Sequence, residues 1–320
     1  MNKALKWEKL GRVFNPQDHP GKSWMYEFAQ APSVLIFDDF VRVYFSCRPK
    51  PDEKGQYVSY SAYVDLNRKN LFEILRIAER PILNLGVLGT FDEFGTYPVS
   101  VIRNENAIMC YYGGWTRCES VPFNVAIGVA ISHDEGKTFS KIGPGPILSY
   151  SPDEPFILSG PKIRKFDNQW YLFYIAGKKW LNNNGKPEPV YQIRMAKSEN
   201  GINWIKHNKD LISTKLEANE CHASPDVFFY EEKYHMVFSY RYSIDYRGKE
   251  KGYRLGYASS DNLIDWVRDD PKAGIDVSDE GWDSEMMSYS HTFELDGIIY
   301  MLYLGNQVGR YGFGLAKLNH

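Results

Sequence analysis

The chain has 320 residues, of which 43% are hydrophobic and 15% aromatic, so it is long enough to bury a sizeable core. Its formal net charge of −2 offers no general attraction to nucleic acid or to an acidic membrane surface. No stretch approaches the roughly 18 apolar residues of a membrane-spanning helix, and Met1 to Pro20 lack the apolar segment of a secretion signal. We therefore expect a soluble, cytoplasmic protein that binds neither nucleic acid nor membranes.

The cysteines are too scattered to indicate a disulfide framework or a zinc site. None of the four belongs to a C-x-x-C pair, and they are spread along the chain. No spacing motif indicates a metal ion or another cofactor, so we expect neither. The four predicted free thiols are Cys47, Cys110, Cys118 and Cys221.

The dominant feature is a pattern that occurs five times with a period of about 65 residues. Each copy has a small or aromatic residue, then an anchor residue, then an apolar strand, a turn and a second, aromatic strand. The spacings between successive anchors are 66, 63, 64 and 65 residues. A fixed period of this length indicates a repeat architecture. The anchors are Pro32, Pro98, Pro161, Pro225 and Ser290.

Each repeat predicts four strands, because its segments alternate in polarity and are rich in aromatic and β-branched residues. Residues 132–139 form an S-x-D-x-G-x-T-F turn between a third and a fourth strand, and looser copies begin at Ser198 and Ser260. In chain order the strands expected after the first repeat are Val99–Arg103, Ala107–Gly113, Val125–Ser132, Phe139–Ile142, Ile163–Phe166, Trp170–Ile175, Gln192–Ser198, Val227–Tyr230, Tyr234–Tyr240, Arg254–Ser259, Thr292–Leu295, Ile299–Leu304 and Gly312–Leu318.

The last repeat lacks a fourth strand, and the N-terminus supplies a spare one. Residues 7–11 (WEKLG) match residues 139–143 (FSKIG), which form the fourth strand of the second repeat. Residues around 6–14 should therefore pair as the outer strand of the last blade. The prediction is an all-β, five-bladed β-propeller that forms a single domain over residues 1–320, with the last blade closed by the N-terminal strand.

In a propeller, the loops before each first strand and after each second strand emerge on one face. Trp115 follows a second strand, and its ring suits the apolar face of a sugar. Cationic residues collect on the same face, which favours an anionic group on the ligand, although a solvated loop rim would give the same pattern. We expect Arg241 among the substrate-binding residues. The other cations of this face are Arg48, Arg117, Lys178, Lys179, Arg247 and Arg310.

Carboxylates recur five residues before the anchors, at Glu27, Glu93, Glu220 and Glu285, with Phe156 in the third repeat. Carboxylates held close together have pKa values that separate, so that one can act as an acid and another as a base or nucleophile. A residue that recurs in four repeats could equally be architectural and bind backbone N–H groups. We expect catalytic roles for Glu93, Glu220, Asp283 and Glu285, and substrate-binding roles for Glu27 and Asp92.

The position directly after each anchor differs from repeat to repeat, as an asymmetric site on a symmetric scaffold requires. Three of these residues, Lys162, Asp226 and His291, can bind sugar hydroxyls or transfer protons, and we expect them in the substrate site. The remaining two are Ser33 and Val99.

Three features carry a resemblance to a known group of proteins: the repeats, the S-x-D/N-G turns, and the segments 89–93 (GTFDE) and 283–287 (DSEMM). Through these features almost the whole chain resembles the five-bladed propeller glycoside hydrolases. These form the superfamily around families 43, 32, 68, 117 and 130. Within that superfamily the chain is similar to family 43-like proteins of bacterial surface-glycan gene clusters. The resemblance implies that the protein acts on, or binds, a sugar or oligosaccharide.

Two positions depart from the family 43 pattern. Ala31 stands where those enzymes place an Asp, and Ser159 stands where they place the acidic Glu before Gly160-Pro161. Three functions stay open. The first is a glycosidase with Glu285 or Glu220 as acid and Asp92, Glu93 or Asp283 as base or nucleophile. The second is a phosphorylase or transferase with an anionic co-substrate, and the third is a non-catalytic carbohydrate-binding propeller.

Overall fold

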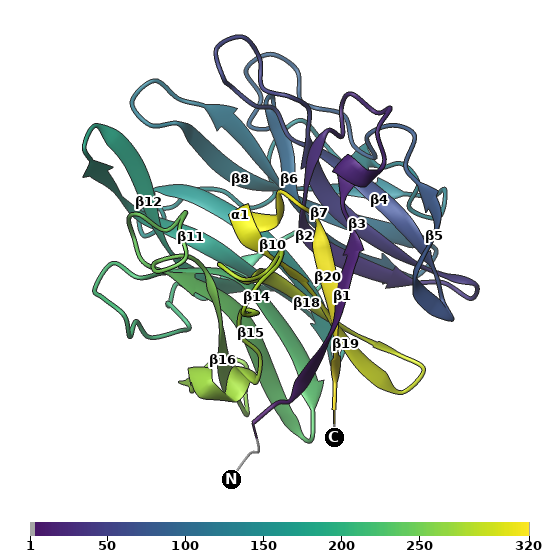
Figure 1. Cartoon of the computed structure of the whole chain (residues 1–320). Helices are drawn as coiled ribbons and strands as arrows, with labels where there is room; N and C mark the ends of the chain where they lie inside the picture. Colours follow the sequence, from purple (N-terminus) through teal and green to yellow (C-terminus); the bar gives the residue numbers. More distant parts are fainter. Residues whose placement is uncertain (1–3, 320) are drawn as a thin grey trace.

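A computed structural model describes residues 4–319 and confirms the predicted five-bladed β-propeller (Figure 1). The strands form five four-stranded antiparallel sheets, which we call blades 1 to 5. Blade 1 is β2 (Glu27–Ile36), β3 (Phe40–Arg48), β4 (Tyr60–Asn67) and β5 (Asn70–Ile77); blade 2 is β6 (Gly95–Asn104), β7 (Ala107–Arg117), β8 (Phe123–Ser132) and β9 (Ser140–Lys141); blade 3 is β10 (Phe156–Phe166), β11 (Gln169–Asn183), β12 (Lys186–Ser198) and β13 (Ile205–Lys206); blade 4 is β14 (Cys221–Tyr230), β15 (Lys233–Arg241), β16 (Arg254–Ser260) and β17 (Val267–Arg268); blade 5 is β18 (Ser288–Leu295), β19 (Ile298–Leu304), β20 (Phe313–Leu318) and β1 (Trp7–Phe14).

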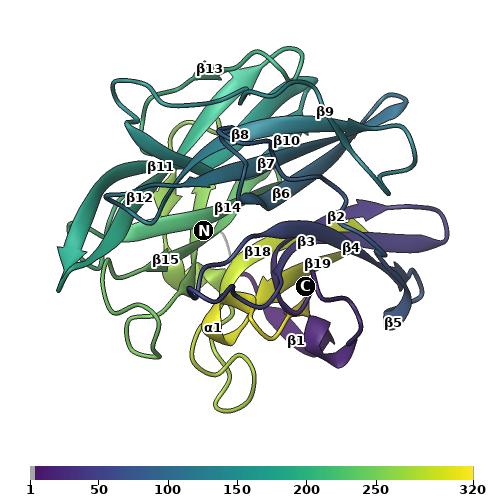
Figure 2. The ribbon, with the colours of Figure 1, turned by 90° about the horizontal axis from the view of Figure 1, so that it is seen from above.

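The first strands of the blades (β2, β6, β10, β14 and β18) lie around the middle of the molecule, as Figure 2 shows from above. Neighbouring blades contact one another mainly through these first strands. Between residues 4 and 319, no helix is both long and apolar enough to cross a bilayer. The short helical segments are Pro16–Asp18, Asp270–Ala273 and α1 (Asn306–Gly309).

The N-terminal strand closes the last blade as predicted. In β1, Trp7 lies opposite Leu318 and Phe14 lies opposite Phe313, so β1 covers the edge of β20. The Trp7 ring is buried in a cluster that includes Met301 and Ala316. Because β1 joins residues from the two ends of the chain, its side chains should contribute to global stability.

We expect Trp7→Ala to lower the free energy of unfolding by about 3–5 kcal/mol, since it removes a large buried side chain and leaves a cavity. Ile205→Ala is the matched control, because Ile205 lies on an outer strand but is 79% exposed. The control should change stability by less than about 0.5 kcal/mol. Denaturant unfolding measures both, and equal effects of the two substitutions would contradict the closure.

A β-bulge at the anchor interrupts the first strand of every blade. The pairing register shifts there, for example between Ser159 and Lys162 in blade 3 and between Ala223 and Asp226 in blade 4. The residue before the anchor has positive φ in four blades. This local geometry explains the small residues that precede several anchors, because bulky side chains are disfavoured at positive φ. These four residues are Ala31 (51°), Gly160 (60°), Ser224 (46°) and Tyr289 (53°).

Candidate functional site

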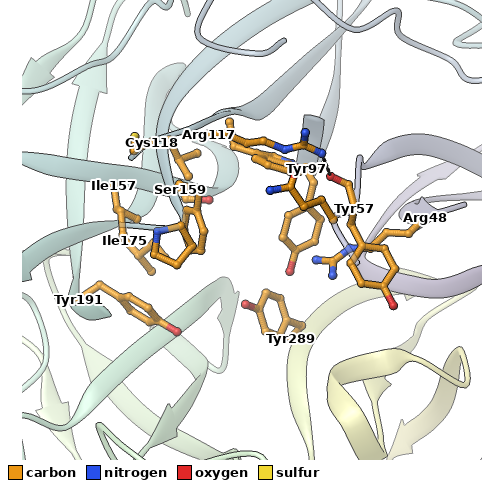
Figure 3. Close-up of a pocket in the computed structure, with 15 residues that line it drawn as sticks. Arg48, Tyr57, Tyr97, Arg117, Cys118, Ile157, Ser159, Ile175, Tyr191 and Tyr289 are labelled. Carbon is orange, nitrogen blue, oxygen red and sulfur yellow. Dashed lines mark hydrogen bonds between the residues drawn. The ribbon is translucent and has the colours of Figure 1, made fainter. Parts of the chain in front are cut away.

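A cavity of about 470 Å³ lies at the end of the central channel where the loops before the first strands emerge. Blades 1, 2, 3 and 5 contribute to it (Figure 3). Among residues 4–319, no Asp or Glu lines this cavity. The lining residues are Arg48, Gln56, Tyr57, Tyr97, Trp115, Arg117, Cys118, Pro122, Phe123, Val125, Ile157, Ser159, Ile175, Tyr191 and Tyr289.

Arg48 places a positive charge in the cavity that forms no ion pair with a carboxylate of residues 4–319. It ends β3, and its guanidinium lies over the rings of Phe28 (4.7 Å), Tyr57 (5.3 Å) and Tyr97 (5.8 Å). Its buried Nε has no hydrogen-bond partner within residues 4–319. Aromatic faces thus hold the cation in place while its donors stay available. An arginine of this kind can bind a carboxylate or phosphate.

Arg117 and Trp115, both on β7, extend this side of the cavity. Arg117 donates to the backbone carbonyl of Tyr57 (3.0 Å) and lies 4.2 Å from the centre of the Phe94 ring. The nearest carboxylate to Arg117 is Asp52, at 4.0 Å. Trp115 was predicted to bind substrate, and the structure places it in the cavity wall. The wall therefore combines two cations with an aromatic face.

Tyrosine hydroxyls supply further polar groups in the cavity. Figure 3 shows the hydroxyl of Tyr97 directed towards Tyr289 in the middle of the cavity. Burial raises the pKa of Tyr97, although the charge of Arg48 and the hydroxyl of Tyr289 partly offset the effect. Burial likewise raises the pKa of Tyr289 well above its usual range. Both phenols are therefore protonated at neutral pH.

Arg241, predicted to bind substrate, instead lies buried behind the cavity wall. Its guanidinium donates to the hydroxyls of Tyr191 (3.0 Å) and Tyr253 (3.1 Å) and to three backbone carbonyls. Since Tyr191 lines the cavity, Arg241 positions a wall residue. No carboxylate is among its hydrogen-bond partners in the described chain, so its charge adds to the positive field of the site.

Glu27 is a buried carboxylate that contacts the cavity-lining residue Tyr57 but does not line the cavity itself. It accepts hydrogen bonds from the hydroxyl of Tyr57 (2.9 Å) and from Nε of Arg310 (2.8 Å). Only 2% of its side chain is exposed. Glu27 thereby fixes the Tyr57 ring against Arg48.

Lys162, Asp226 and His291 come together in the channel, as the equivalence of their positions predicted. The Lys162 ammonium lies 3.3 Å from Nδ1 of His291, and that nitrogen lies 3.7 Å from Asp226. All three are buried. Burial lowers the pKa of Lys162 to about 8 and, together with the charge of Lys162, lowers that of His291 well below its usual range.

The same channel residues also join neighbouring blades. The backbone N–H of Thr292 in blade 5 donates to Asp226 (2.5 Å), and that of Val34 in blade 1 donates to Nε2 of His291 (3.1 Å). Oγ of Ser33 accepts from Val101 (3.1 Å) in the same way. These contacts join neighbouring blades, so the cluster stabilises the blade junctions.

Three carboxylates form a repeated support inside their blades. Each accepts a hydrogen bond from the tyrosine 20 residues further along the chain and pairs with a lysine of the outer strand. The cations come from the same blade, so the pairs tie its second and fourth strands to the preceding loop. The supports are Asp92 with Tyr112 and Lys141, Glu154 with Tyr174 and Lys206, and Asp283 with Tyr303 and Lys9.

Glu220 has the corresponding place in blade 4, with Arg268 as its outer-strand cation (2.7 Å). Backbone N–H groups of Lys215 (2.5 Å) and Leu216 (2.8 Å) also donate to it. Burial alone would raise the pKa of Glu220, but the hydrogen bonds from His222, Arg268 and the backbone outweigh burial and lower it to about 2. An ionised, fully paired carboxylate of this kind is poorly suited to donate a proton.

The two remaining predicted catalytic residues lie outside the cavity lining. Glu93 accepts from the backbone N–H of Gly89 (2.9 Å) in its own loop. Glu285 is half-buried, its backbone N–H donates to Asn306 (2.8 Å) and its carbonyl accepts from Arg254 (2.8 Å). None of Glu93, Glu220, Asp283 and Glu285 lines this cavity, and their catalytic role stays a prediction.

We expect Glu220→Gln to lower the free energy of unfolding by about 3 kcal/mol, because it leaves the buried Arg268 without this partner. The folded-state pKa of Glu220 is depressed, so its contribution is present above pH 4.5 and is lost as the pH falls towards 2. Denaturant unfolding from pH 7 to pH 3 should therefore show a smaller pH dependence in the variant. Glu93→Gln is the control and should change stability by less than about 0.5 kcal/mol. Unchanged stability of Glu220→Gln together with lost turnover would instead support a catalytic Glu220.

Trp115 was predicted to bind substrate, whereas the tyrosines of the cavity were not predicted. Tyr97 and Tyr289 each stand directly before an anchor, so the repeat itself contained the signal that could have found them. Tyr57 and Tyr191 lie in or after a connecting loop and had no such signal. Within residues 4–319, no group of three or more His, Cys, Asp or Glu side chains is arranged to hold a metal ion.

Several solved structures that superpose on this chain are described as glycoside hydrolases or mannoside phosphorylases. A structure described as a glycoside hydrolase superposes with a TM-score of 0.75 at 14% identity and covers 98% of this chain and 92% of that one. The β-1,2-mannobiose phosphorylase from Listeria innocua superposes with a TM-score of 0.69 at 12% identity, over 99% and 96% of the two chains. The chain therefore shares its five-bladed fold with these two enzymes.

No family model matches the sequence. The chain is 33% identical over 317 residues to "Uncharacterized protein Rv1502" of Mycobacterium tuberculosis (strain ATCC 25618 / H37Rv), which covers 99% of this chain and 100% of that protein. It belongs to the same family as that protein. A shorter match, 25% identical over 166 residues, is to a β-1,2-mannobiose phosphorylase of Thermoanaerobacter sp. (strain X514) and covers 46% of this chain and 52% of that protein.

Proposed function

We propose that the protein is a carbohydrate-active enzyme whose site is the channel-mouth cavity, and that it transfers a glycosyl group between a sugar and an anion such as phosphate. The observation that carries this proposal is Arg48, a cation in the cavity wall for which residues 4–319 provide no carboxylate partner. Buried or half-buried cations without an acid are costly unless a ligand supplies the negative charge. Arg117 and the buried Arg241 add to the same field.

Sequence similarity to a mannobiose phosphorylase supports this reaction over hydrolysis. Hydrolysis by the usual pair of carboxylates would need two such groups about 5–10 Å apart around the sugar. The cavity lining in the described chain has none, whereas phosphorolysis needs an anion site and one proton donor. Trp115 would stack against the sugar ring beside the anion.

We propose Tyr97 as the proton donor. A phosphate oxygen held by Arg48 would form a bond to the anomeric carbon while the glycosidic C–O bond breaks. The leaving oxygen would take the phenol proton of Tyr97, and the phenolate would be stabilised by Arg48 and by the Tyr289 hydroxyl. The phenolate would then regain a proton from water.

The test is to incubate the protein with a panel of oligosaccharides, β-1,2-mannobiose included, with and without inorganic phosphate. The proposal expects a sugar 1-phosphate, formed only when phosphate is present. Release of free sugars at the same rate without phosphate would identify a hydrolase. Saturable binding of oligosaccharide with no turnover in either condition would identify a non-catalytic binding propeller.

A further inference from the structure

The cavity has two chemically different sides. Arg48, Arg117, Tyr57, Tyr97 and Tyr289 form a polar side from blades 1, 2 and 5. Facing it, blades 2 and 3 contribute a side made mainly of aliphatic and aromatic groups, with Ser159 and Tyr191 close to them. We call the latter the apolar wall; it consists of Pro122, Phe123, Val125, Ile157 and Ile175.

The apolar wall offers few hydrogen bonds to a ligand. The backbone N–H groups of Val125 (3.1 Å) and Ile157 (2.9 Å) both donate to Oδ1 of Asn124, so they are already satisfied. Behind the wall lies a hydrophobic cluster that includes Val190 and Cys221. A sugar hydroxyl pressed against this surface would lose its hydration and gain no partner in return, which is unfavourable.

Backbone strain marks one residue of this wall. Ile157 has φ of 49°, a left-handed conformation that is strongly disfavoured for a β-branched side chain. The hydrogen bond from its N–H to Asn124 helps to hold it there. Strain of this kind, retained beside a cavity, is typical of positions where side-chain placement serves binding.

From these observations, and resting on the proposed function, we infer that the sugar carries an apolar substituent that packs against the apolar wall. The chemical class is a sugar with a 6-deoxy carbon, an O-methyl group or a short acyl group. Its anionic partner binds on the opposite, polar side at Arg48. An unsubstituted hexose would place a hydroxyl against the carbon atoms of the apolar wall.

The experiment compares sugars that differ at one group, in the presence of inorganic phosphate. Calorimetric or NMR titrations would use L-rhamnose against L-mannose, D-fucose against D-galactose, D-quinovose against D-glucose, and 3-O-methyl-D-glucose against D-glucose. We expect the deoxy or methylated member of at least one pair to bind about 10-fold more tightly, as is usual for one apolar group in a matching pocket.

Two variants of Ile175 test whether the apolar wall causes the preference for the deoxy or methylated sugar. Ile175→Thr and Ile175→Val remove the same methylene group and differ only in a hydroxyl against a methyl group. The valine variant should keep the preference, whereas the threonine variant should reduce it to about 3-fold or less, because its hydroxyl can pair with a sugar hydroxyl. Thermal unfolding checks that both variants are folded.

Equal or tighter binding of the hydroxylated member in every pair would overturn the inference and leave the proposed function standing. An unchanged preference in both Ile175 variants would also overturn it, since the selectivity would then arise elsewhere. Failure of the wild-type protein to bind any sugar of the panel, with or without phosphate, would overturn both the inference and the proposed function.

Discussion

Arg48→Met should lower kcat/KM for phosphate-dependent glycosyl transfer by about 10²–10³-fold, because it removes the cation that would bind the phosphate and stabilise the transition state. The long apolar side chain of methionine can still pack against the rings of Phe28 and Tyr57. The backbone hydrogen bonds of Arg48 are kept in the variant, and its side-chain Nε has no hydrogen-bond partner in the described chain, so the melting temperature should change little. Steady-state kinetics at varied phosphate concentration measure the effect.

Two further variants sharpen the test of Arg48. Arg48→Lys keeps the charge and loses the planar fork, so it should recover part of the activity at high phosphate concentration. Lys50→Met removes an exposed lysine two residues away and should leave the kinetics unchanged. If Arg48→Met retained full activity with an unchanged KM for phosphate, the proposed anion site would be wrong.

Tyr97→Phe should lower kcat by about 10²–10⁴-fold, since it removes the proposed proton donor and leaves the ring in the wall. The loss should be greatest for substrates whose leaving group needs protonation. A glycosyl donor with an acidic phenol as leaving group should therefore recover much of the rate in the variant.

Tyr191→Phe is the matched control for Tyr97→Phe. Its hydroxyl belongs to the same cavity wall but is held by Arg241 and Tyr253. We expect this control to lower stability, through the buried donors it leaves unpaired, and to keep most of the turnover. Equal losses of kcat in the two variants, or no rescue by the activated substrate, would exclude Tyr97 as the acid.

The fold could be predicted because its determinants are local and repeated. Alternating polarity predicted the strands, and the match of residues 7–11 with 139–143 predicted the closure of the last blade by β1. Strand ends were less accurate: β7 continues to Arg117 and β11 to Asn183, beyond the predicted ends at Gly113 and Ile175. The polarity pattern weakens where strands extend into the loops around the cavity.

The candidate site was harder to predict, because it depends on how loops of different length place their side chains. Counting a fixed number of residues from each anchor selected Phe156 in blade 3 and passed over Glu154, which forms the support with Tyr174. The related carboxylates lie six, seven, five and seven residues before their anchors, at Asp92, Glu154, Glu220 and Asp283. A tyrosine stands 20 residues after each of the four, and this spacing would have indicated their shared structural role.

The cations on the loop face were identified from the sequence, but their state of pairing was not. Arg310 pairs with Glu27, Arg247 with Glu188 and Lys178 with Asp210, whereas Arg48 has no carboxylate partner in the part of the chain that the structure describes. These partners come from other blades or distant loops, so no local pattern could separate a paired cation from a free one. Only the three-dimensional arrangement reduces seven candidate cations to two in the cavity wall, Arg48 and Arg117.

A crystal structure of the protein with inorganic phosphate at a concentration that supports turnover tests the central claim most directly. We expect phosphate in the channel-mouth cavity, within hydrogen-bond distance of the Arg48 guanidinium and on the side opposite the apolar wall. A cavity without phosphate, together with phosphate or sugar bound beside Glu93 or Glu285, would contradict it.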